Sequence, residues 1–182
     1  MGEEPFFVLA VLGALGSGVM AGVFCAFSVL VMRGLAALPP AQGVAAMNAI
    51  NSVATSPVFL ALFLGTATLI AVIAVVTFVM WPDGATVELL LGSALYLCGA
   101  FGVTVVANVP RNERLGRLAA ERPARPGAPG GARPAKAGTE AGEVETDAVA
   151  YWPAYVREWT RWNHVRTVSS AAAAVTYLLA LA

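Results

Sequence analysis

Charged residues are scarce in this chain: Asp, Glu, Lys and Arg make up 12% of the sequence, whereas 58% of it is hydrophobic. The stretches 6–32 and 57–81 carry no charge, and each is long enough to cross the apolar part of a bilayer. A water-soluble helical bundle needs a polar face that repeats with the helical period, and neither stretch has one. The scarcity of charge therefore argues against a soluble domain and predicts an integral membrane protein.

Cysteine and histidine are nearly absent, with two cysteines and one histidine. Cys25 and Cys98 each lie inside an apolar stretch, where a cysteine is usually a small packing residue, so no disulfide framework is expected. Both lie about 12–15 Å deeper along their helices than His164, by helical rise, and cannot bind one ion with it. Without a second histidine or paired carboxylates inside the membrane, the sequence predicts no metal site.

Several other functional classes lack their signatures. The formal net charge is zero, which gives no reason to expect nucleic-acid binding. Neither a glycine-rich nucleotide loop nor a nucleophile elbow is present. The lack of intramembrane carboxylates and inverted repeats argues against a transporter. Glu3 and Glu4, rather than a basic segment, precede the first apolar stretch, so we expect that stretch to stay as a helix and not to be removed as a secretory signal.

Hydropathy predicts an all-α fold, a four-helix transmembrane bundle that forms a single membrane domain over residues 1–182. The predicted spans are 6–32, 57–81, 87–109 and 165–182. The turn Pro82-Asp83-Gly84 joins the second and third spans as an antiparallel hairpin. Before the last span, the segment 123–142, rich in Pro, Gly and Arg, is expected to be a disordered loop. The aromatic segment 148–164 is expected to be an interfacial amphipathic helix, which can continue into the last span.

Basic residues flank the spans unevenly. Arg33 lies in the first connection, and the second connection has no basic residue. The third connection carries Arg111, Arg114, Arg117, Arg157 and Arg161. Because basic residues favour the cytoplasmic side, the first and third connections are predicted to be cytoplasmic, with both termini on the opposite side of the cell membrane.

Small residues recur every four positions in the first two spans. They are Ala14, Gly18, Gly22 and Ala26 in the first span, and Ala61 and Gly65 in the second. Such spacing favours close helix packing, either within the bundle or in a homo-oligomer through Gly18 and Gly22. The alternative is that the spacing only reflects an alanine-rich composition.

Polar residues gather at the predicted cytoplasmic ends of the spans. Asn48 and Asn51, three residues apart, share one helix face, and their alternative role is to cap helices and form turns. Asn108 directly follows an apolar stretch, where an unpaired carboxamide costs a few kcal/mol. Together with Arg111 and Asn112 it marks either a binding site or a helix end with cytoplasmic anchors.

A third polar group opens the last span. Trp159, Asn163 and Arg166 are spaced by four and three residues and so share one helix stripe, with Tyr155 one turn earlier. An arginine just inside a span faces the bundle interior or a wet cavity, or extends out to the interface. His164 lies one position off this stripe, and it is interpreted either as a general base or as an interfacial residue among lipid headgroups.

Taken together, these motifs resemble the anthrone oxygenase-like family of small, four-helical membrane proteins. The resemblance is carried by the glycine-rich first span, the Asn-bearing first connection, Asn108-x-Pro-x-Asn112 with Leu115, and Trp159-x-x-x-Asn163-x-x-Arg166. It covers the chain apart from the segment 123–142.

The resemblance implies oxidation of an anthrone to an anthraquinone by dioxygen, without a metal or other cofactor, since a deprotonated anthrone can itself reduce oxygen. From side-chain chemistry, His164 would be the base of this reaction, with Arg166, Asn163, Asn108 and Asn112 as donors to the anionic oxygen. Trp159 or Tyr155 would stack on the flat ring, and Asn48 and Asn51 are further candidate substrate-binding residues.

A second functional class remains open. The same Asn and Arg residues can simply tie the helices together in a non-catalytic membrane subunit or a small-molecule-binding membrane protein. The expected partners are membrane lipids and a hydrophobic aromatic small molecule.

Overall fold

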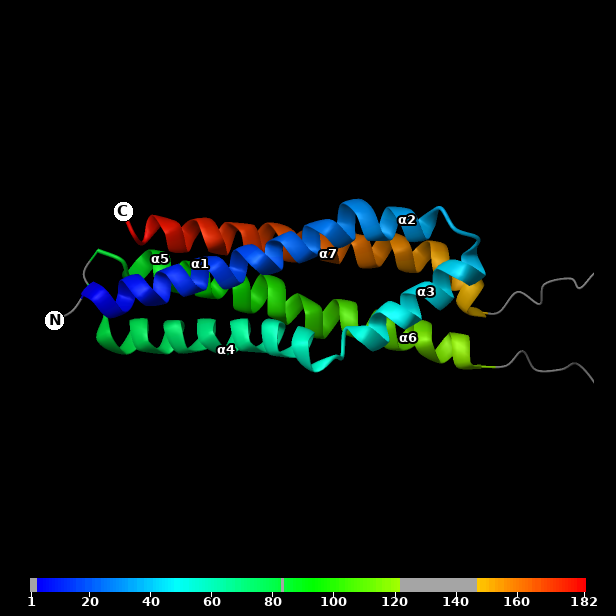
Figure 1. Cartoon of the computed structure of the whole chain (residues 1–182), viewed down its shortest axis with the longest axis horizontal. Helices are drawn as coiled ribbons and strands as arrows, with labels where there is room; N and C mark the ends of the chain where they lie inside the picture. Colours follow the sequence, from blue (N-terminus) through cyan, green and yellow to red (C-terminus); the bar gives the residue numbers. More distant parts are fainter. Residues whose placement is uncertain (1–2, 83, 122–146) are drawn as a thin grey trace, which may run out of the picture.

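The computed structural model describes residues 3–82, 84–121 and 147–182, and the regular elements in these ranges are helices (Figure 1). In chain order they are α1 (Glu3–Ala26), the π-helix η1 (Phe27–Val31), α2 (Met32–Ala36), α3 (Pro40–Val53), α4 (Pro57–Met80), α5 (Thr86–Ala94), the π-helices η2 (Leu95–Gly102) and η3 (Thr104–Asn108), α6 (Val109–Ala120) and α7 (Asp147–Leu179). The segment 123–142, predicted to be a disordered loop, lies outside the described residues.

Three helical stretches of the described chain are long and apolar enough to cross a membrane: Pro5–Ala36, Pro57–Met80 and Thr86–Ala120. The first joins α1, η1 and α2, and the third joins α5, η2, η3 and α6. These stretches make the chain a multi-pass membrane protein. Their apolar outer faces leave many large hydrophobic side chains exposed, among them Leu15, Val58 and Val106.

The third stretch continues beyond the predicted end of its span. The predicted membrane span ends at about Val109, and helical structure runs on to Ala120. Pro110 sits in the first turn of α6, directly after the π-helical turn η3, and such local changes of winding accommodate a proline in a helix. The Arg111 side chain also donates to the Ala107 carbonyl at 2.8 Å.

Helix α7 is a single helix of 33 residues that joins the predicted interfacial segment to the predicted last span. It packs along α1 for much of its length and also contacts α5, η2, α6 and α3 (Figure 1). The two chain termini lie at the same end of the molecule.

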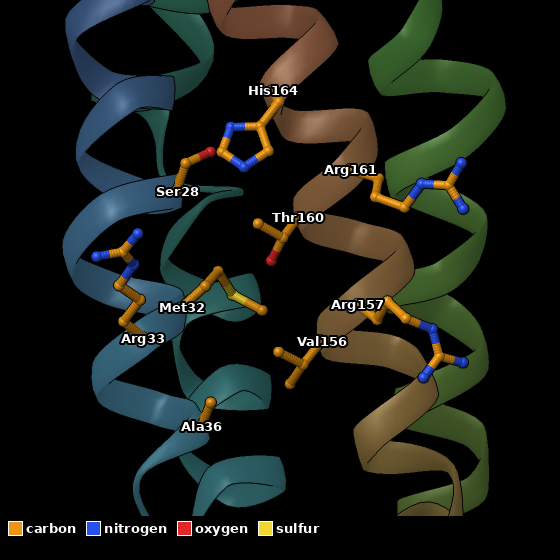
Figure 2. A pocket seen from close by; sticks show the side chains of 9 residues that line it. All are labelled: Ser28, Met32, Arg33, Ala36, Val156, Arg157, Thr160, Arg161 and His164. Carbon is orange, nitrogen blue, oxygen red and sulfur yellow. The ribbon is translucent and has the colours of Figure 1, made fainter.

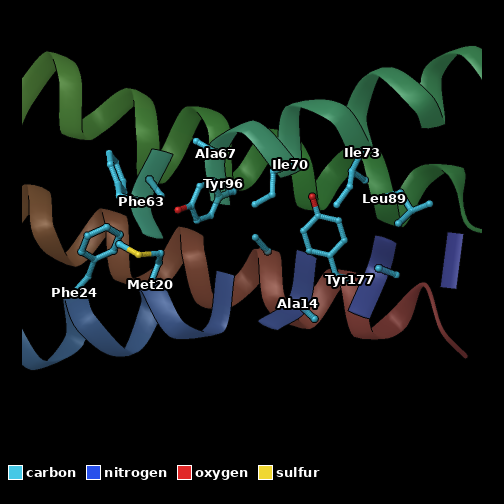
Figure 3. Close-up of a cluster of buried hydrophobic side chains, with 13 residues drawn as sticks. Ala14, Met20, Phe24, Phe63, Ala67, Ile70, Ile73, Leu89, Tyr96 and Tyr177 are labelled. Atoms are coloured by element: carbon cyan, nitrogen blue, oxygen red, sulfur yellow. The ribbon is translucent and has the colours of Figure 1, made fainter. Parts of the chain in front are cut away.

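Two hydrophobic clusters divide the molecule along its length. One lies between α1, α4, α5, η2 and the C-terminal half of α7, with Phe24, Phe63, Ile70, Tyr96 and Tyr177 among its residues (Figure 3). The other joins α2, α3 and α6 to the N-terminal half of α7, through residues that include Met32, Met47, Leu115, Trp152 and Trp159. The polar residues of interest lie where these clusters meet on α7.

The row of small residues does not form the close contacts within the chain. A Cβ built at Gly18, Gly22 or Gly65 would meet no atom within 4 Å. A step of four residues advances the direction around a helix by about 40° beyond a full turn, so a row that starts at the buried Ala14 turns outward. Close approaches occur elsewhere, at Gly99 against Ser169 and at Gly43, where a Cβ would lie 2.6 Å from Trp152.

Candidate functional site

One face of α7 carries a buried row of aromatic and polar side chains. Tyr155 and Asn163 have no exposed surface, and Trp159 and Arg166 are 4% and 7% exposed. These four residues recur at helical spacing, so the row faces the other helices along two turns and more of α7. The helix stripe in the sequence therefore corresponds to the interior face of the structure.

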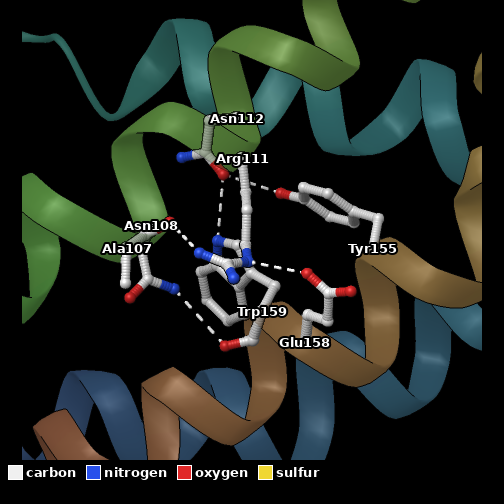
Figure 4. A network of polar contacts seen from close by, with 7 residues as sticks. All are labelled: Ala107, Asn108, Arg111, Asn112, Tyr155, Glu158 and Trp159. Atoms are coloured by element: carbon white, nitrogen blue, oxygen red, sulfur yellow. Dashed lines mark hydrogen bonds and ion pairs between the residues drawn. The ribbon is translucent and has the colours of Figure 1, made fainter.

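The N-terminal part of this row, Tyr155 and Trp159, is hydrogen-bonded to Asn108 and Asn112, where η3 continues into α6 (Figure 4). The side-chain oxygen Oδ1 of Asn112 accepts hydrogen bonds from the Tyr155 hydroxyl at 2.7 Å and from Trp159 Nε1 at 2.9 Å. Asn108 Nδ2 donates to the Trp159 carbonyl at 3.4 Å. Burial raises the pKa of Tyr155 above its ordinary value, so the hydroxyl stays protonated as the donor to Asn112. These contacts hold α6 against α7.

Asn163 ties α7 to the first helical stretch. Its Nδ2 donates to the Phe24 carbonyl at 2.6 Å and to the Ser28 hydroxyl oxygen at 2.7 Å. Ser28 is buried in the π-helical turn η1, a type of turn that is frequent at functional sites. Both donor hydrogens of the Asn163 amide are therefore bonded to protein groups.

Arg166 faces the interior rather than extending to the interface. The carbon of its guanidinium group lies 3.8 Å from the centroid of the Phe24 ring and 5.7 Å from that of the Trp159 ring. A desolvated cation–π contact is worth about 2 kcal/mol, which offsets part of the cost of burying the charge. Among the described residues no carboxylate pairs with Arg166, and its Nε has no hydrogen-bond partner.

Asn48 and Asn51 lie on α3, which packs against both α6 and α7. Both are half-buried, and within the described chain Asn51 Nδ2 is buried without a hydrogen-bond partner. The hydroxyls that follow them form turn contacts, from Ser52 to the Ala49 carbonyl and from Thr55 to the Ser52 carbonyl, each at 2.7 Å. These contacts match the turn chemistry expected at such a helix end.

His164 lies apart from the buried row. It is exposed and lines an open groove of about 320 Å³ between η1–α2 and α7 (Figure 2). The residues that line the groove are Ser28, Met32, Arg33, Ala36, Val156, Arg157, Thr160, Arg161 and His164. None of these residues is a carboxylate, and four of them are basic, so the groove favours an anionic ligand.

The walls of the groove differ in character from its rim. Met32, Ala36 and Val156 give it an apolar surface, and the Ser28 hydroxyl points across the gap toward His164 (Figure 2). Arg33 flanks one side, and Arg157 and Arg161 flank the other, with guanidinium groups that turn outward. Long arginine side chains of this kind reorient at little cost.

Comparison with known proteins identifies the family to which the chain belongs. A family model described as anthrone oxygenase matches residues 57–176, more than half of the chain. The chain belongs to the anthrone oxygenase family. The matched range includes the buried row and His164, whereas the η1–α2 side of the groove precedes it. No curated protein and no solved structure matches the chain.

Sequence reasoning missed several residues that lie beside the predicted site residues. Ser28 and Thr160 line the groove, and Phe24 and Tyr96 are buried, Phe24 with its ring against the guanidinium group of Arg166. The available signal for Ser28 and Tyr96 was a polar side chain inside an otherwise apolar span. Their partners come from other helices, and no spacing within one helix indicates them.

The structure also places the cysteines. Cys25 and Cys98 are free and exposed. Across the described ranges, no three residues among His, Cys, Asp and Glu lie close enough to hold a metal ion together.

Proposed function

We propose that this member of the anthrone oxygenase family oxidises anthrone-like polycyclic phenols with dioxygen, and that the substrate lies in the groove between η1–α2 and α7. The observation that carries the proposal is the groove itself, which is lined by an apolar surface, the imidazole of His164 and the side chains of three arginines on its rim. Its volume of about 320 Å³ lies at the lower end of the range for small-molecule sites and suits a flat tricyclic ring.

The reaction requires a general base and positive charge near the substrate oxygen, and it requires no nucleophilic side chain. His164 takes a proton from the methylene carbon of the anthrone, and the carbanion that results is delocalised onto the carbonyl oxygen. The carbanion gives one electron to dioxygen, and the two radicals combine to a peroxide. Loss of water then leaves a new carbonyl, with one oxygen atom in the quinone and the other in water. Arg157 and Arg161, on the rim of the groove, attract the anionic form of the substrate electrostatically without a fixed contact.

In this proposal the buried row holds the groove in shape. Asn108, Asn112 and Tyr155 fix α6 against α7, and Asn163 fixes η1 against the same helix. Arg166 lies within the interior, where contacts with the Phe24 and Trp159 rings offset part of the cost of burying its charge.

We further propose that the C-terminal part of α7 is a fourth membrane crossing, with the basic ends of the helices in the cytoplasm and both termini on the other side of the cell membrane. The location of both termini at one end of the molecule supports an even number of crossings. The Gly18 and Gly22 face of α1 has open space beside it, which leaves room for a second copy of the chain.

The test is to mix the detergent-purified protein with an anthrone in air and to follow the absorbance of the quinone. We expect turnover well above that of buffer, and the same turnover after treatment with a chelator. Folded protein that gives no more quinone than buffer would contradict the proposed reaction. Binding of an anthrone without turnover would instead support the small-molecule-binding alternative, and loss of turnover on chelation would show that a metal takes part.

A further inference from the structure

The hydroxyl of Ser28 accepts a hydrogen bond from Asn163, whereas the buried helical hydroxyls of Ser17, Thr77 and Ser170 have no hydrogen-bond partner in the described chain. A serine or threonine inside a helix usually donates its proton to the carbonyl four residues earlier. Ser93, Thr104, Thr167 and Thr176 all do so, at 2.7–2.9 Å. The corresponding carbonyl for Ser28 is that of Phe24, which accepts a hydrogen bond from the Asn163 side chain and none from the Ser28 hydroxyl.

Asn163 also determines whether the Ser28 hydroxyl is the donor or the acceptor in their hydrogen bond. The amide nitrogen Nδ2 is purely a donor, so the Ser28 oxygen must be the acceptor in their 2.7 Å hydrogen bond. The Ser28 proton is then left for another acceptor, and the described residues offer it none. Ser28 is 4% exposed, but it lines the groove and its oxygen points toward His164, so the groove is the side from which a ligand oxygen can reach this proton (Figure 2).

We propose that Ser28 donates this proton to the anionic oxygen of the ligand in the groove, and that Asn163 is the residue that positions it. The inference rests on the proposed function, because it takes the groove as the substrate site. It narrows the ligand class to flat aromatic compounds with an ionised phenol or enol oxygen, since an uncharged hydrocarbon would gain nothing from the donor. It also gives Asn163 a role that requires no contact with the ligand.

Thr160 is the competing donor in the same groove. Its hydroxyl oxygen is buried and has no partner within the described part of the chain. Unlike Ser28, it has no neighbouring donor that fixes the direction of its proton. The Thr160→Val variant, which keeps the shape and removes the hydroxyl, therefore separates the two candidates.

The experiment measures binding of a hydroxyanthraquinone to the full-length protein in detergent. This probe resembles the product, so it is not consumed, and its absorption spectrum distinguishes the neutral from the ionised form. Titration at several pH values gives the dissociation constant of each form. A hydrogen bond to a charged oxygen contributes enough that its loss weakens binding about tenfold or more. We therefore expect Ser28→Ala to weaken binding of the ionised form about tenfold and that of the neutral form less than about twofold.

Matched variants distinguish a role in binding from a role in folding. Ser28→Thr keeps the hydroxyl and should restore most of the affinity. Thr176→Val removes a helical hydroxyl far from the groove, and Thr160→Val removes the competing donor, and neither should change the ratio between the two forms. Asn163→Ala should act in the same direction as Ser28→Ala, and the double variant should be no weaker than Ser28→Ala, because Asn163 acts through Ser28.

Each outcome decides the question. Equal affinity of wild type and Ser28→Ala for the ionised probe would overturn the assignment, as would a loss confined to Thr160→Val. Wild-type protein that binds the probe but does not oxidise an anthrone would refute the proposed reaction, while the titration would still decide the role of Ser28. Wild-type protein that binds neither form would refute both.

Discussion

The two faces of α7 show how one helix separates structural from chemically available groups. On the interior face, Asn163 is fully buried and both hydrogens of its amide are bonded to α1 and η1. One residue further along the chain, His164 is exposed and lines the groove. A step of one residue turns about 100° around a helix, so neighbours in sequence belong to different environments.

The difference follows from the cost of burial. An unpaired polar group in an apolar interior costs about 1–3 kcal/mol, and on the interior face the Tyr155, Trp159 and Asn163 side chains donate to groups on other helices. Exposed groups on the groove face, such as His164, keep contact with water or lipid headgroups and can remain free. The groove face is therefore where a ligand can be bound without breaking the fold, and the interior face is where substitutions destabilise the protein.

The largest effect is expected on the groove face. His164→Ala should lower the rate of quinone formation about 100-fold or more, because a positioned general base contributes that much. The free energy of unfolding should change by less than about 0.5 kcal/mol, as is usual for an exposed residue. Val168→Ala, at another exposed position of α7, serves as the control for both measurements. A rate within threefold of wild type would remove His164 from the reaction.

The interior face should respond in the opposite way. Asn163→Ala removes two hydrogen bonds and leaves the Phe24 carbonyl without its side-chain donor, so we expect the free energy of unfolding to fall by about 2 kcal/mol. The measurement is unfolding in mixed micelles, compared with Val165→Ala on the same helix. A stability equal to that of wild type would mean that the amide is not structural, and the contrast between the two faces would then be wrong.

Removing an arginine from the rim of the groove should reduce quinone formation less than removing His164. Arg161→Gln should raise KM about threefold and leave kcat nearly unchanged, because a flexible, solvated arginine attracts the anionic ligand without a fixed contact. The effect should shrink as salt is added. Arg117→Gln provides the control, since Arg117 is exposed on α6 and does not line the groove. An equal change in both variants would indicate a general effect of net charge.

Much of this arrangement could be predicted from the sequence, because the signals lie within single helices. Apolar length predicted α4, which runs over Pro57–Met80, and the spacing of Trp159, Asn163 and Arg166 predicted a shared face of one helix. The family was also recognisable from these motifs, and the match over residues 57–176 confirms it. The roles assigned to the individual residues stay predictions.

What could not be predicted depends on contacts between helices. The sequence grouped His164 with Asn163 and Arg166 as one catalytic set, whereas the fold places the groove and the buried row on different faces of α7. The importance of Ser28 depends on an amide that is 135 positions away in the chain. Helical winding was a further limit, because nothing in the sequence indicated the π-helical turn η3 that precedes Pro110 in the continuous helix.

The smallest effect is expected at the edge of the interior face, where Arg111 Nε and Glu158 Oε2 form an ion pair at 3.1 Å. The side chains are 24% and 41% exposed, so water screens their attraction, and such pairs contribute about 0.2–1 kcal/mol. Glu158→Gln should therefore lower the free energy of unfolding by less than about 1 kcal/mol and leave quinone formation unchanged. Arg111 keeps its hydrogen bond to the Ala107 carbonyl in this variant, which limits the loss further. A loss as large as that of Asn163→Ala would show that partly exposed contacts also hold α6 to α7, and the boundary between the two faces would then have to include them.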